Sequence, residues 1–344
     1  MIKISAPYRI YLIGEHASVY GEPALLSAIQ FRLTLRLTRS TNIKYVDYRF
    51  GLANSWPLKD VHETTNKVLN LWNSCAEIQD FSRLNEFIRK DDFLNYRKSA
   101  IGTALDKLKI KSGLSIFIAS DLPIGSGLAS SAALAVSLVK GIAELHNIKI
   151  SLDKTNRIAF DLEKIIHCTS SGGDNSICCF GGLLWFQKLN HKNQIIQLKT
   201  DIPKEFNNFV LVYTKPPEKT TGELVQLVRN LDNRYREVRI KKIGELVYEM
   251  KGILKDNNFK RMVEILNEDQ RLLSELGVSC KEINEVSDAV KKIGGAAKLS
   301  GAGGGGAMLC YHHDDKQKLI KTIKNLGYEF WNIKFSLQGV MIED

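Results

Sequence analysis

Hydrophobic and polar residues alternate along much of the first fifty positions, and this period of two predicts β-strands. Residues 2–12 are rich in isoleucine and tyrosine, as strands usually are. The alternation is cleaner over residues 30–40, where it places the apolar side chains on one face, and residues 43–50 follow as a third candidate strand. The chain is therefore expected to open with a β-sheet.

A helical period replaces this alternation over residues 59–109, where apolar residues lie three and four positions apart. Residues 112–123 then form a candidate strand that ends in a proline. Two more helices are predicted after it, one over residues 128–145 and one that ends near His167. The first half of the chain therefore mixes strands with helices.

The second half of the pattern is mostly helical. Strands are expected at residues 181–189 and 209–214, and the chain is then largely helical from Thr220 to about Ile293. The tail alternates strand, helix and strand. Strands mixed with helices, followed by a helix-rich half that strands close, indicate an α+β fold in two lobes.

The length of the chain also fits two domains. It has 344 residues, 44% of them hydrophobic, and domains average about 150 residues. The polar stretch 190–208 separates the two patterns, so we expect one domain over residues 1–195 and a second over residues 196–344. A composition this close to the globular average excludes a disordered, collagen-like or disulfide-scaffold chain.

Charge and cysteine content limit which binding partners and which cellular compartment are expected. Lys and Arg number 48 against 38 Asp and Glu, a formal net charge of +10, which suits nucleic acid, a membrane surface or an anionic substrate. Glu237 interrupts the basic run 234–242 on a predicted helix, so we expect a solvated face and no nucleic-acid partner. The apolar stretch 128–139 is too short to cross a bilayer, so no membrane partner is expected. No Cys-x-x-Cys pair occurs, so we expect reduced cysteines and a cytoplasmic protein. The sequence does not determine the oligomeric state, and a homodimer stays open.

One segment combines a glycine turn with the start of a helix. Residues 123–133 read PIGSGLASSAA, directly after a predicted strand. Unpaired backbone N–H groups at a helix start attract phosphate, and glycines let a phosphate chain approach the backbone. Serine hydroxyls in the first turn can cap the helix or reach a Mg²⁺ ion on the phosphates. An ordinary turn with a serine cap accounts for the same residues equally well.

A second glycine-rich segment lies near the C-terminus. Residues 300–307 read SGAGGGGA and formally contain G-x-G-x-x-G. A dinucleotide fingerprint must follow a first strand and open a helix, whereas residues 307–313 continue here as a strand, so that interpretation fails. So many glycines cost backbone entropy, which favours close approach to a ligand over a plain loop. The chain has no G-x-x-x-x-G-K-[ST] motif and no zinc spacing, and His312 to Asp315 are predicted to form a solvated turn.

A third segment places acidic residues beside the second predicted helix. Glu163 and His167 lie one turn apart on one helix face. A Ser/Gly loop is then expected to present Asp174 just before a strand that begins near Cys178. Asp174 is either a turn residue or a carboxylate that faces a cleft as a base, and the local pattern leaves both open.

Taken in order, these segments resemble the GHMP small-molecule kinases, and most closely the mevalonate kinases among them. Residues 6–21, APYRIYLIGEHASVYG, are similar to the first motif of that family. Residues 123–133 resemble its phosphate loop and residues 298–307, KLSGAGGGGA, its third motif. The stretch 174–182, DNSICCFGG, also resembles the mevalonate kinases. The resemblance extends over nearly the whole chain.

The resemblance implies a fold and a reaction. The N-terminal domain, residues 1–195, is expected to resemble domain 2 of ribosomal protein S5 and to bind ATP through the phosphate loop. The C-terminal domain, residues 196–344, is expected to be ferredoxin-like and to carry the third motif. The implied reaction transfers the γ-phosphate of ATP to a small-molecule alcohol, most closely mevalonate to 5-phosphomevalonate, with Mg²⁺ as a cofactor. The basic charge of the chain suits an anionic acceptor.

The resemblance also assigns roles to individual residues. Asp174 is implied as the base or orienting carboxylate, Arg9 as the cation over the γ-phosphoryl group, and Ser131 with Glu163 as the Mg²⁺ ligands. The residues implied in phosphate binding are Pro123, Gly125, Ser126, Gly127, Leu128, Ala129, Ser130 and Ser131. The residues implied around the acceptor are Glu15, His16, Thr220, Gly303 and Gly304, with Thr221 as an alternative to Thr220.

Departures from the family pattern keep other functions open. Arg9 stands where mevalonate kinases carry lysine, and arginine at this place resembles the sugar kinases of the superfamily. The loop 168–173 lacks the proline of mevalonate kinases, and Ala129 replaces a glycine of the phosphate loop. A sugar or sugar-phosphate kinase, galactokinase-like or heptose-phosphate-kinase-like, is therefore the alternative. A non-catalytic nucleotide-binding sensor is a lesser one, because Asp174, Glu163 and both serines are retained.

Overall fold

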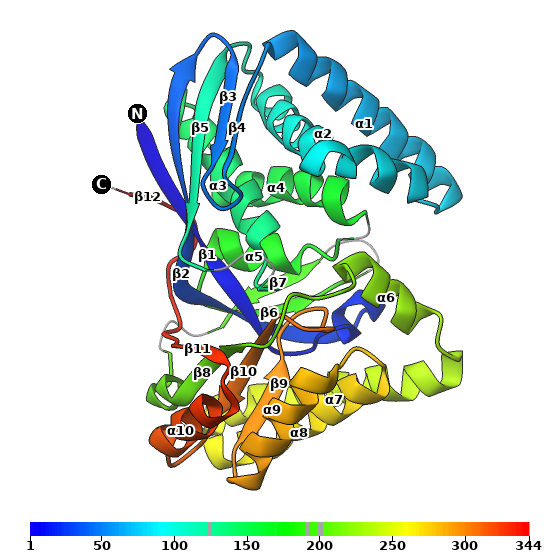
Figure 1. Ribbon diagram of the computed structural model, residues 1–344, viewed down its shortest axis with the longest axis vertical. Coiled ribbons are helices and arrows are strands. Elements are labelled where there is room, and N and C mark those ends of the chain that lie inside the picture. The colour runs from blue at the N-terminus through cyan, green and yellow to red at the C-terminus, as the bar shows by residue number, and fades with distance from the viewer. Residues whose placement is uncertain (123–125, 169, 190–192, 199–201, 344) are drawn as a thin grey trace.

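The computed structural model describes residues 1–122, 126–168, 170–189, 193–198 and 202–343. These residues form two lobes, each built on its own β-sheet with helices packed against it (Figure 1). The expected two-lobed α+β fold is therefore confirmed. No helix in the described part of the chain is long and apolar enough to cross a membrane.

The first lobe is built on an eight-stranded sheet in the order β12-β1-β2-β5-β3-β4, with β6 and β7 branching from β2. Pairing is antiparallel throughout except between β3 and β5. The strands are β1 (Ile2–Ile13), β2 (Pro23–Ser40), β3 (Ile43–Asp47), β4 (Leu52–Trp56), β5 (Gly113–Ser120), β6 (Leu183–Gln187), β7 (Gln194–Gln197) and β12 (Met341–Glu343). Leu33, Leu35 and Leu37 of β2 are fully buried, as their alternation predicts.

The helices of the first lobe form layers. They are η1 (Ala17–Tyr20), α1 (Leu58–Ile78), α2 (Ser82–Leu108), α3 (Ser130–Leu145), α4 (Leu152–His167) and α5 (Gly173–Phe180). Of these, α3 and α5 pack on the sheet, and α1, α2 and α4 pack on other helices. Helix α3 packs closely on β1 and β2, and a Cβ at Gly141 would stand 2.4 Å from the Leu37 side chain. The small residues of α3 therefore let this helix, whose N-terminus belongs to the phosphate loop, approach the sheet.

The second lobe is built on a four-stranded antiparallel sheet in the order β11-β8-β10-β9. Its strands are β8 (Phe209–Tyr213), β9 (Ala296–Leu299), β10 (Ala307–Tyr311) and β11 (Glu329–Asn332). Its helices are η2 (Lys204–Asn208), α6 (Thr221–Arg229), α7 (Asn233–Asp256), α8 (Phe259–Glu275), α9 (Lys281–Lys292) and α10 (Lys316–Leu326). In its core, the buried ring of Phe209 packs against the buried rings of Phe206 and Tyr311.

The last strand returns to the first lobe. Strand β12 pairs with β1, and Lys3 lies opposite Glu343. The expected division at 195/196 falls within β7, so the sheet of the first lobe takes residues from both sides of it. A three-residue strand that pairs with the opposite end of the chain has no local pattern from which it could be predicted.

Most predicted elements are present, and the exceptions are informative. Residues 59–109 form the two helices α1 and α2, and the helix predicted to end near His167 is α4. Residues 173–180 were expected to be loop and strand, but they form the helix α5. That expectation was wrong because a short apolar run such as Ile177 to Cys179 fits a buried helix as well as a strand.

Candidate active site

A cleft of about 290 Å³ opens between the two lobes. Its walls come from the end of β1, the phosphate loop, the C-terminal end of α4, the first turn of α5, the loop 300–305 and the start of α6. Segments that lie far apart in the sequence therefore meet here. The three motifs of the sequence all contribute to one site.

Arg9 and Asp174 form the ion pair at the centre of the cleft. Arg9 Nε and Nη2 donate to the two Asp174 oxygens at 2.7 and 2.9 Å, and Nη1 donates to the Gly127 carbonyl at 3.1 Å. A bidentate contact of this kind fixes the plane of the carboxylate. Burial works against the charge of Arg9, but the attraction of Asp174 outweighs it and raises the pKa of the guanidinium. Asp174, which lies in the first turn of α5, remains partly open to the cleft.

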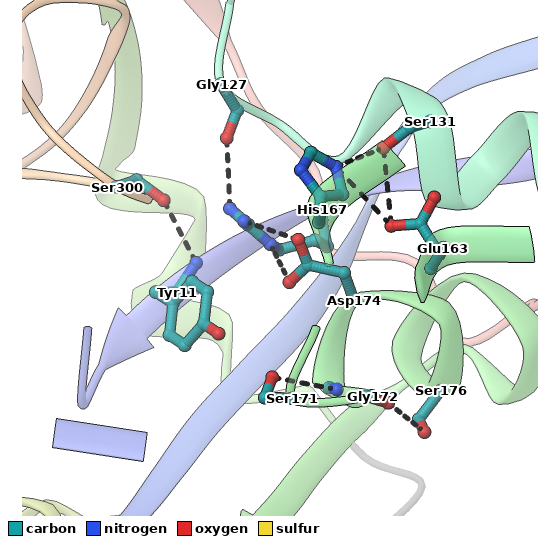
Figure 2. A network of polar contacts seen from close by, with 12 residues as sticks. Tyr11, Gly127, Ser131, Glu163, His167, Ser171, Gly172, Asp174, Ser176 and Ser300 are labelled. Carbon is teal, nitrogen blue, oxygen red and sulfur yellow. Dashed lines mark hydrogen bonds and ion pairs between the residues drawn. The ribbon is translucent and has the colours of Figure 1, made fainter. Parts of the chain in front are cut away.

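Glu163, Ser131 and His167 form a second polar group next to this pair (Figure 2). Ser131 Oγ donates to Glu163 Oε2 at 3.3 Å and lies 3.0 Å from His167 Nε2. Burial, reinforced by the negative charge of Asp174, raises the pKa of Glu163 to about 8. Its other oxygen, Oε1, is buried without a hydrogen-bond partner among the described residues. A buried carboxylate oxygen without a partner is suited to binding a cation.

The described part of the phosphate loop lies at the start of α3. Of the residues predicted to bind phosphate, Pro123 and Gly125 lie outside the described residues, and the others line the cleft: Ser126, Gly127, Leu128, Ala129, Ser130 and Ser131. Main-chain hydrogen bonds fix the loop on both sides. Arg9 N donates to Leu128 O at 3.1 Å, and Ala307 N donates to Ser126 O at 2.9 Å.

The two adjacent serines of the loop have different partners. Ser131 faces Glu163, whereas Ser130 accepts a hydrogen bond from Arg49 Nη1 at 2.7 Å. Arg49 is in turn held by both oxygens of the buried Asp47. A second cation therefore stands at the helix start. Arg49 lies far from the motifs in the sequence, and no local pattern singles it out.

The third-motif loop, residues 300–306, packs against the phosphate loop. A Cβ at Gly301 would stand 2.9 Å from the Gly127 carbonyl, and one at Gly303 would stand 2.1 Å from the Val278 carbonyl. Both residues also have positive φ, so glycine is required on two grounds. Gly303 lines the cleft, whereas the predicted Gly304 does not, and its N–H donates to the Val278 carbonyl at 2.8 Å.

The first motif contains a turn, residues 14–16, that contacts the third-motif loop. His16 lines the cleft, and its Nε2 lies 2.9 Å from the Ala302 carbonyl. Burial lowers the pKa of His16, which favours a neutral ring. Glu15 also belongs to the wall of the cleft, but its carboxylate is fully buried and pairs with Lys298.

The two candidate threonines have different surroundings. Thr220 is the N-cap of α6, and its hydroxyl forms a capping box with Glu223. Thr221, the alternative, lines the cleft together with Lys219. Because the capping box already uses the Thr220 hydroxyl, Thr221 replaces it as the threonine at the cleft.

Comparisons with known proteins agree with this geometry. Residues 95–182 match the GHMP kinases N terminal domain, and residues 250–329 match the GHMP kinases C terminal model. The mevalonate kinase of Pyrococcus abyssi is 29% identical over 100% of this chain and 98% of its own length. The mevalonate kinase of Candida albicans is also 29% identical, over 98% of this chain and 89% of its own length.

Solved structures share the whole fold. A crystal structure of mevalonate kinase is 26% identical, with a TM-score of 0.77 over 98% of this chain and 99% of that one. The Methanococcus jannaschii mevalonate kinase is 25% identical, with a TM-score of 0.78 over 97% of this chain and 98% of that one. The chain therefore belongs to the GHMP kinases, with one family domain in each lobe. It is an ATP-dependent phosphotransferase that acts on an alcohol.

Proposed function

We propose that this kinase transfers the γ-phosphate of ATP to mevalonate, giving 5-phosphomevalonate. The observation that carries the proposal is the Arg9–Asp174 pair, which faces the phosphate loop and the Glu163–Ser131 contact across one cleft. Full-length similarity to mevalonate kinases supports mevalonate as the acceptor. The free thiols of all six cysteines suit a reducing compartment such as the cytoplasm.

Asp174 and Arg9 act on the acceptor hydroxyl. Phosphoryl transfer asks the protein mainly for in-line positioning and for neutralisation of charge. Asp174 accepts a hydrogen bond from the attacking hydroxyl and takes its proton as transfer proceeds. Arg9 keeps the carboxylate in one orientation through two hydrogen bonds, and its positive charge stands beside the γ-phosphoryl group. Arginine stays protonated at any physiological pH, so this role needs no tuned amine.

Glu163 and Ser131 would hold Mg²⁺. Mg²⁺ is commonly bound by one or two carboxylates together with substrate phosphates, and the residues present fit that pattern. Glu163 Oε1 has no hydrogen-bond partner among the described residues, and Ser131 Oγ lies beside the other oxygen. When bound, the ion neutralises charge on the phosphate oxygens. No larger cluster of acidic, His or Cys ligands occurs among the residues that the structure describes.

The backbone of the phosphate loop would bind the triphosphate. Helix α3 begins at Ser130, so its first N–H groups point into the cleft where an anion is favoured. Ala307 of β10, which directly follows the third-motif loop, holds this backbone in place by donating a hydrogen bond to the Ser126 carbonyl. The triphosphate therefore meets a preformed site.

An anionic acceptor meets positive charge on the opposite wall. Lys219 lines the cleft and is exposed, and it enters no ion pair in the described parts of the chain. Its ammonium group is therefore available to the carboxylate of an acceptor such as mevalonate.

One observation favours the second candidate function, a sugar or sugar-phosphate kinase. Arg9 stands where mevalonate kinases carry lysine, and galactokinase from Lactococcus lactis shares the fold, with a TM-score of 0.73 at 18% identity. At this identity the likeness concerns the fold alone. We keep mevalonate as the proposal because of the full-length relatives.

A comparison of acceptor substrates tests the proposal. ATP-dependent ADP release in Mg²⁺ would be measured with mevalonate, phosphomevalonate, galactose, galacturonate and heptose 7-phosphate. We expect a kcat/KM for mevalonate at least about a hundredfold above that of every other acceptor. A higher kcat/KM for a sugar would replace the proposed acceptor. ATP binding without turnover on the panel would contradict the proposal.

A further inference from the structure

Three fully buried ionisable groups meet beneath the acceptor side of the cleft. They are Glu15 in the first-motif turn, Asp269 on α8 and Lys298 on β9. The Lys298 ammonium donates to Glu15 Oε1 and to the Leu299 carbonyl, and it lies 3.3 Å from Asp269 Oδ2. None of the three side chains has any exposed surface. The cluster joins the first lobe to the second.

The charges of this cluster do not balance. Two carboxylates and one ammonium leave a surplus negative charge, and a buried unpaired charge is strongly unfavourable. The ion pairs of the described residues give neither carboxylate a cation other than Lys298. Glu15 Oε2 and both Asp269 oxygens also lack a hydrogen-bond donor among these residues. A single proton would remove both the surplus charge and the lack of a donor.

The two carboxyl groups are close enough to share that proton. Asp269 and Glu15 lie within hydrogen-bonding reach of each other. Burial is the main cause that raises the pKa of Glu15 to about 8, the negative charge of Asp269 adds to it, and Lys298 opposes it. Burial raises the pKa of Asp269 in the same direction.

The other titratable groups around the cluster do not supply a compensating charge. Tyr11 of β1 faces Glu15, and its own pKa is raised by burial, so the phenol is neutral. Glu268 of α8 adds a further negative charge near Asp269. Gln270, the neighbour of Asp269 on α8, is neutral, and it accepts a hydrogen bond from Leu299 N at 2.8 Å.

The cluster lies at the point where the first and third motifs are joined. Glu15 is next to His16, whose φ of 57° is unusual for a residue other than glycine. His16 Nε2 contacts the Ala302 carbonyl, and Ser300 Oγ accepts a hydrogen bond from Tyr11 N at 2.9 Å. A strained turn persists only where its surroundings hold it, and the Glu15–Lys298 contact is one of those constraints.

We propose that Glu15 and Asp269 share one proton and that this carboxyl pair, capped by Lys298, is a positioning element of the kinase. It holds the first-motif turn, and with it His16, against the third-motif loop at the acceptor side of the cleft. The inference deepens the proposed function and rests on it for the identity of the acceptor. Lys298 and Asp269 act through Glu15 and touch neither substrate.

The proposal predicts a dependence on pH. As pH rises through about 8, the shared proton leaves, two negative charges remain beside one ammonium, and the turn loses its support. Fewer molecules retain the pair at pH 9 than at pH 7, so the KM for the acceptor rises severalfold over this range. The KM for ATP should change little, because no hydrogen bond or ion pair joins the cluster to residues 126–131 of the phosphate loop.

Asp269→Asn is the decisive variant, because an amide supplies the missing hydrogen-bond donor without the second negative charge. The KM for mevalonate and for ATP would be measured from pH 6 to pH 9 in the wild-type enzyme and the variant. We expect the acceptor KM of Asp269→Asn to stay level over this range while that of the wild type rises. Glu163 is present in both proteins, so its own titration cancels in the comparison.

A matched control is Asp288→Asn, the same substitution at an exposed position on α9. It should follow the wild-type pH profile. Lys298→Arg should retain a low acceptor KM at pH 7, whereas Lys298→Met should raise it. An acceptor KM of Asp269→Asn that rises with pH as the wild type does would overturn the proposal.

A second readout needs no acceptor. The raised pKa means that the folded protein binds the shared proton more tightly than the unfolded chain does. The resulting stabilisation is complete at acid pH and is lost as pH rises through about 8. The unfolding temperature of the wild type should therefore fall from pH 6 to pH 9 more steeply than that of Asp269→Asn, or of Glu15→Gln if that variant folds better. Equal slopes would overturn the proposal even if mevalonate were not the acceptor.

Discussion

All three guanidinium nitrogens of Arg9 form hydrogen bonds, and together these bonds connect two parts of the site. Two nitrogens bind Asp174, and the third binds the Gly127 carbonyl of the phosphate loop. The residue that orients the Asp174 carboxylate therefore also supports the phosphate loop. This double contact uses the planar, forked geometry of arginine, which a lysine side chain does not have.

Replacing Asp174 with asparagine should separate binding from chemistry. The amide keeps the size of the side chain but cannot take the proton of the acceptor hydroxyl, so kcat should fall by about 10²–10⁴. The Kd for ATP should stay within about twofold of wild type, since Asp174 does not bind the triphosphate. Turnover and nucleotide binding would be measured by coupled assay and titration calorimetry.

Arg9→Lys is the companion variant, because it keeps the charge and loses the bidentate contact. We expect it to retain more activity than Asp174→Asn. Asp288→Asn, outside the residues that line the cleft, should behave as wild type. Near-normal turnover of Asp174→Asn would remove this carboxylate from the mechanism.

The proposed role of Glu163 as a ligand of Mg²⁺ predicts that the demand for Mg²⁺ depends on pH. Its pKa is raised to about 8, so a proton competes with the metal at lower pH. The concentration of free Mg²⁺ needed for half-maximal activity should therefore fall as pH rises from 6 to 8. Glu163→Gln should raise this concentration about tenfold or more and remove its dependence on pH.

The control for this measurement is Glu237→Gln on the exposed face of α7, which should keep the wild-type Mg²⁺ titration. An identical titration for Glu163→Gln and wild type would show that Glu163 does not hold the ion. Free Mg²⁺ is varied at saturating nucleotide, so that the binding of ATP itself does not limit the rate.

Among the elements, α4 could be predicted from sequence and α5 could not. Helix α4 has sixteen residues with a clear apolar face and a serine cap at Ser151, whereas α5 has eight residues and follows a glycine pair. The short helix is set by its packing on the sheet, which the local pattern does not contain. This matters for the site, because α5 places Asp174 in a helical first turn rather than in a loop.

Part of the site could also be predicted from the sequence. The phosphate loop, Glu163 and Asp174 belong to contiguous motifs, so their proximity follows from the resemblance to a known family. The partnerships of Arg49 with Ser130 and of Lys298 with Glu15 join residues that are distant in the chain. Such pairs depend on how strands and lobes pack, and the sequence alone gives no measure of that.

Ala129 introduces a local strain at the start of α3. It is the N-cap of that helix and has a φ of 64°, a left-handed conformation that favours glycine. Ala129→Gly should therefore raise the free energy of unfolding by about 1 kcal/mol. The shift would be measured by denaturant unfolding of the two proteins.

Ala132→Gly provides the comparison, because Ala132 lies inside the same helix and is fully buried. There the loss of the methyl group should destabilise the protein by about 1 kcal/mol. A destabilising effect of Ala129→Gly as large as that of Ala132→Gly would contradict the assigned backbone conformation.

The last residues that the structure describes add a strand to the sheet of the first lobe. Strand β12 pairs with β1, and Glu343 accepts a hydrogen bond from Ser5 and lies 3.7 Å from Arg32 Nε. Removal of residues 341–344 should therefore lower the unfolding temperature by about 2–4 °C. Calorimetry of the truncated and full chains would measure this.

Glu343→Gln distinguishes the strand from its charge. It keeps the backbone pairing of β12 with β1 and should retain most of the stability that the truncation loses. An unchanged unfolding temperature after truncation would show that β12 does not stabilise the first lobe.

The two lobes matter together because every group of the proposed reaction lies where they meet. The phosphate loop and Asp174 come from the first lobe, and the third-motif loop and Lys219 come from the second. In the proposed function, the first lobe would bind the nucleotide and supply Asp174, and Lys219 of the second lobe would bind the anionic alcohol. A phosphotransferase that acts on mevalonate is the function that uses both lobes.

The measurement to make is the identification of the product formed from mevalonate and ATP in Mg²⁺, by ³¹P NMR and mass spectrometry. We expect one new phosphate monoester, 5-phosphomevalonate, formed in equal amount to ADP by the wild-type protein and at a rate lower by about 10²–10⁴ with Asp174→Asn. ADP formed without a phosphorylated acceptor, or no ADP while ATP is bound, would contradict the account.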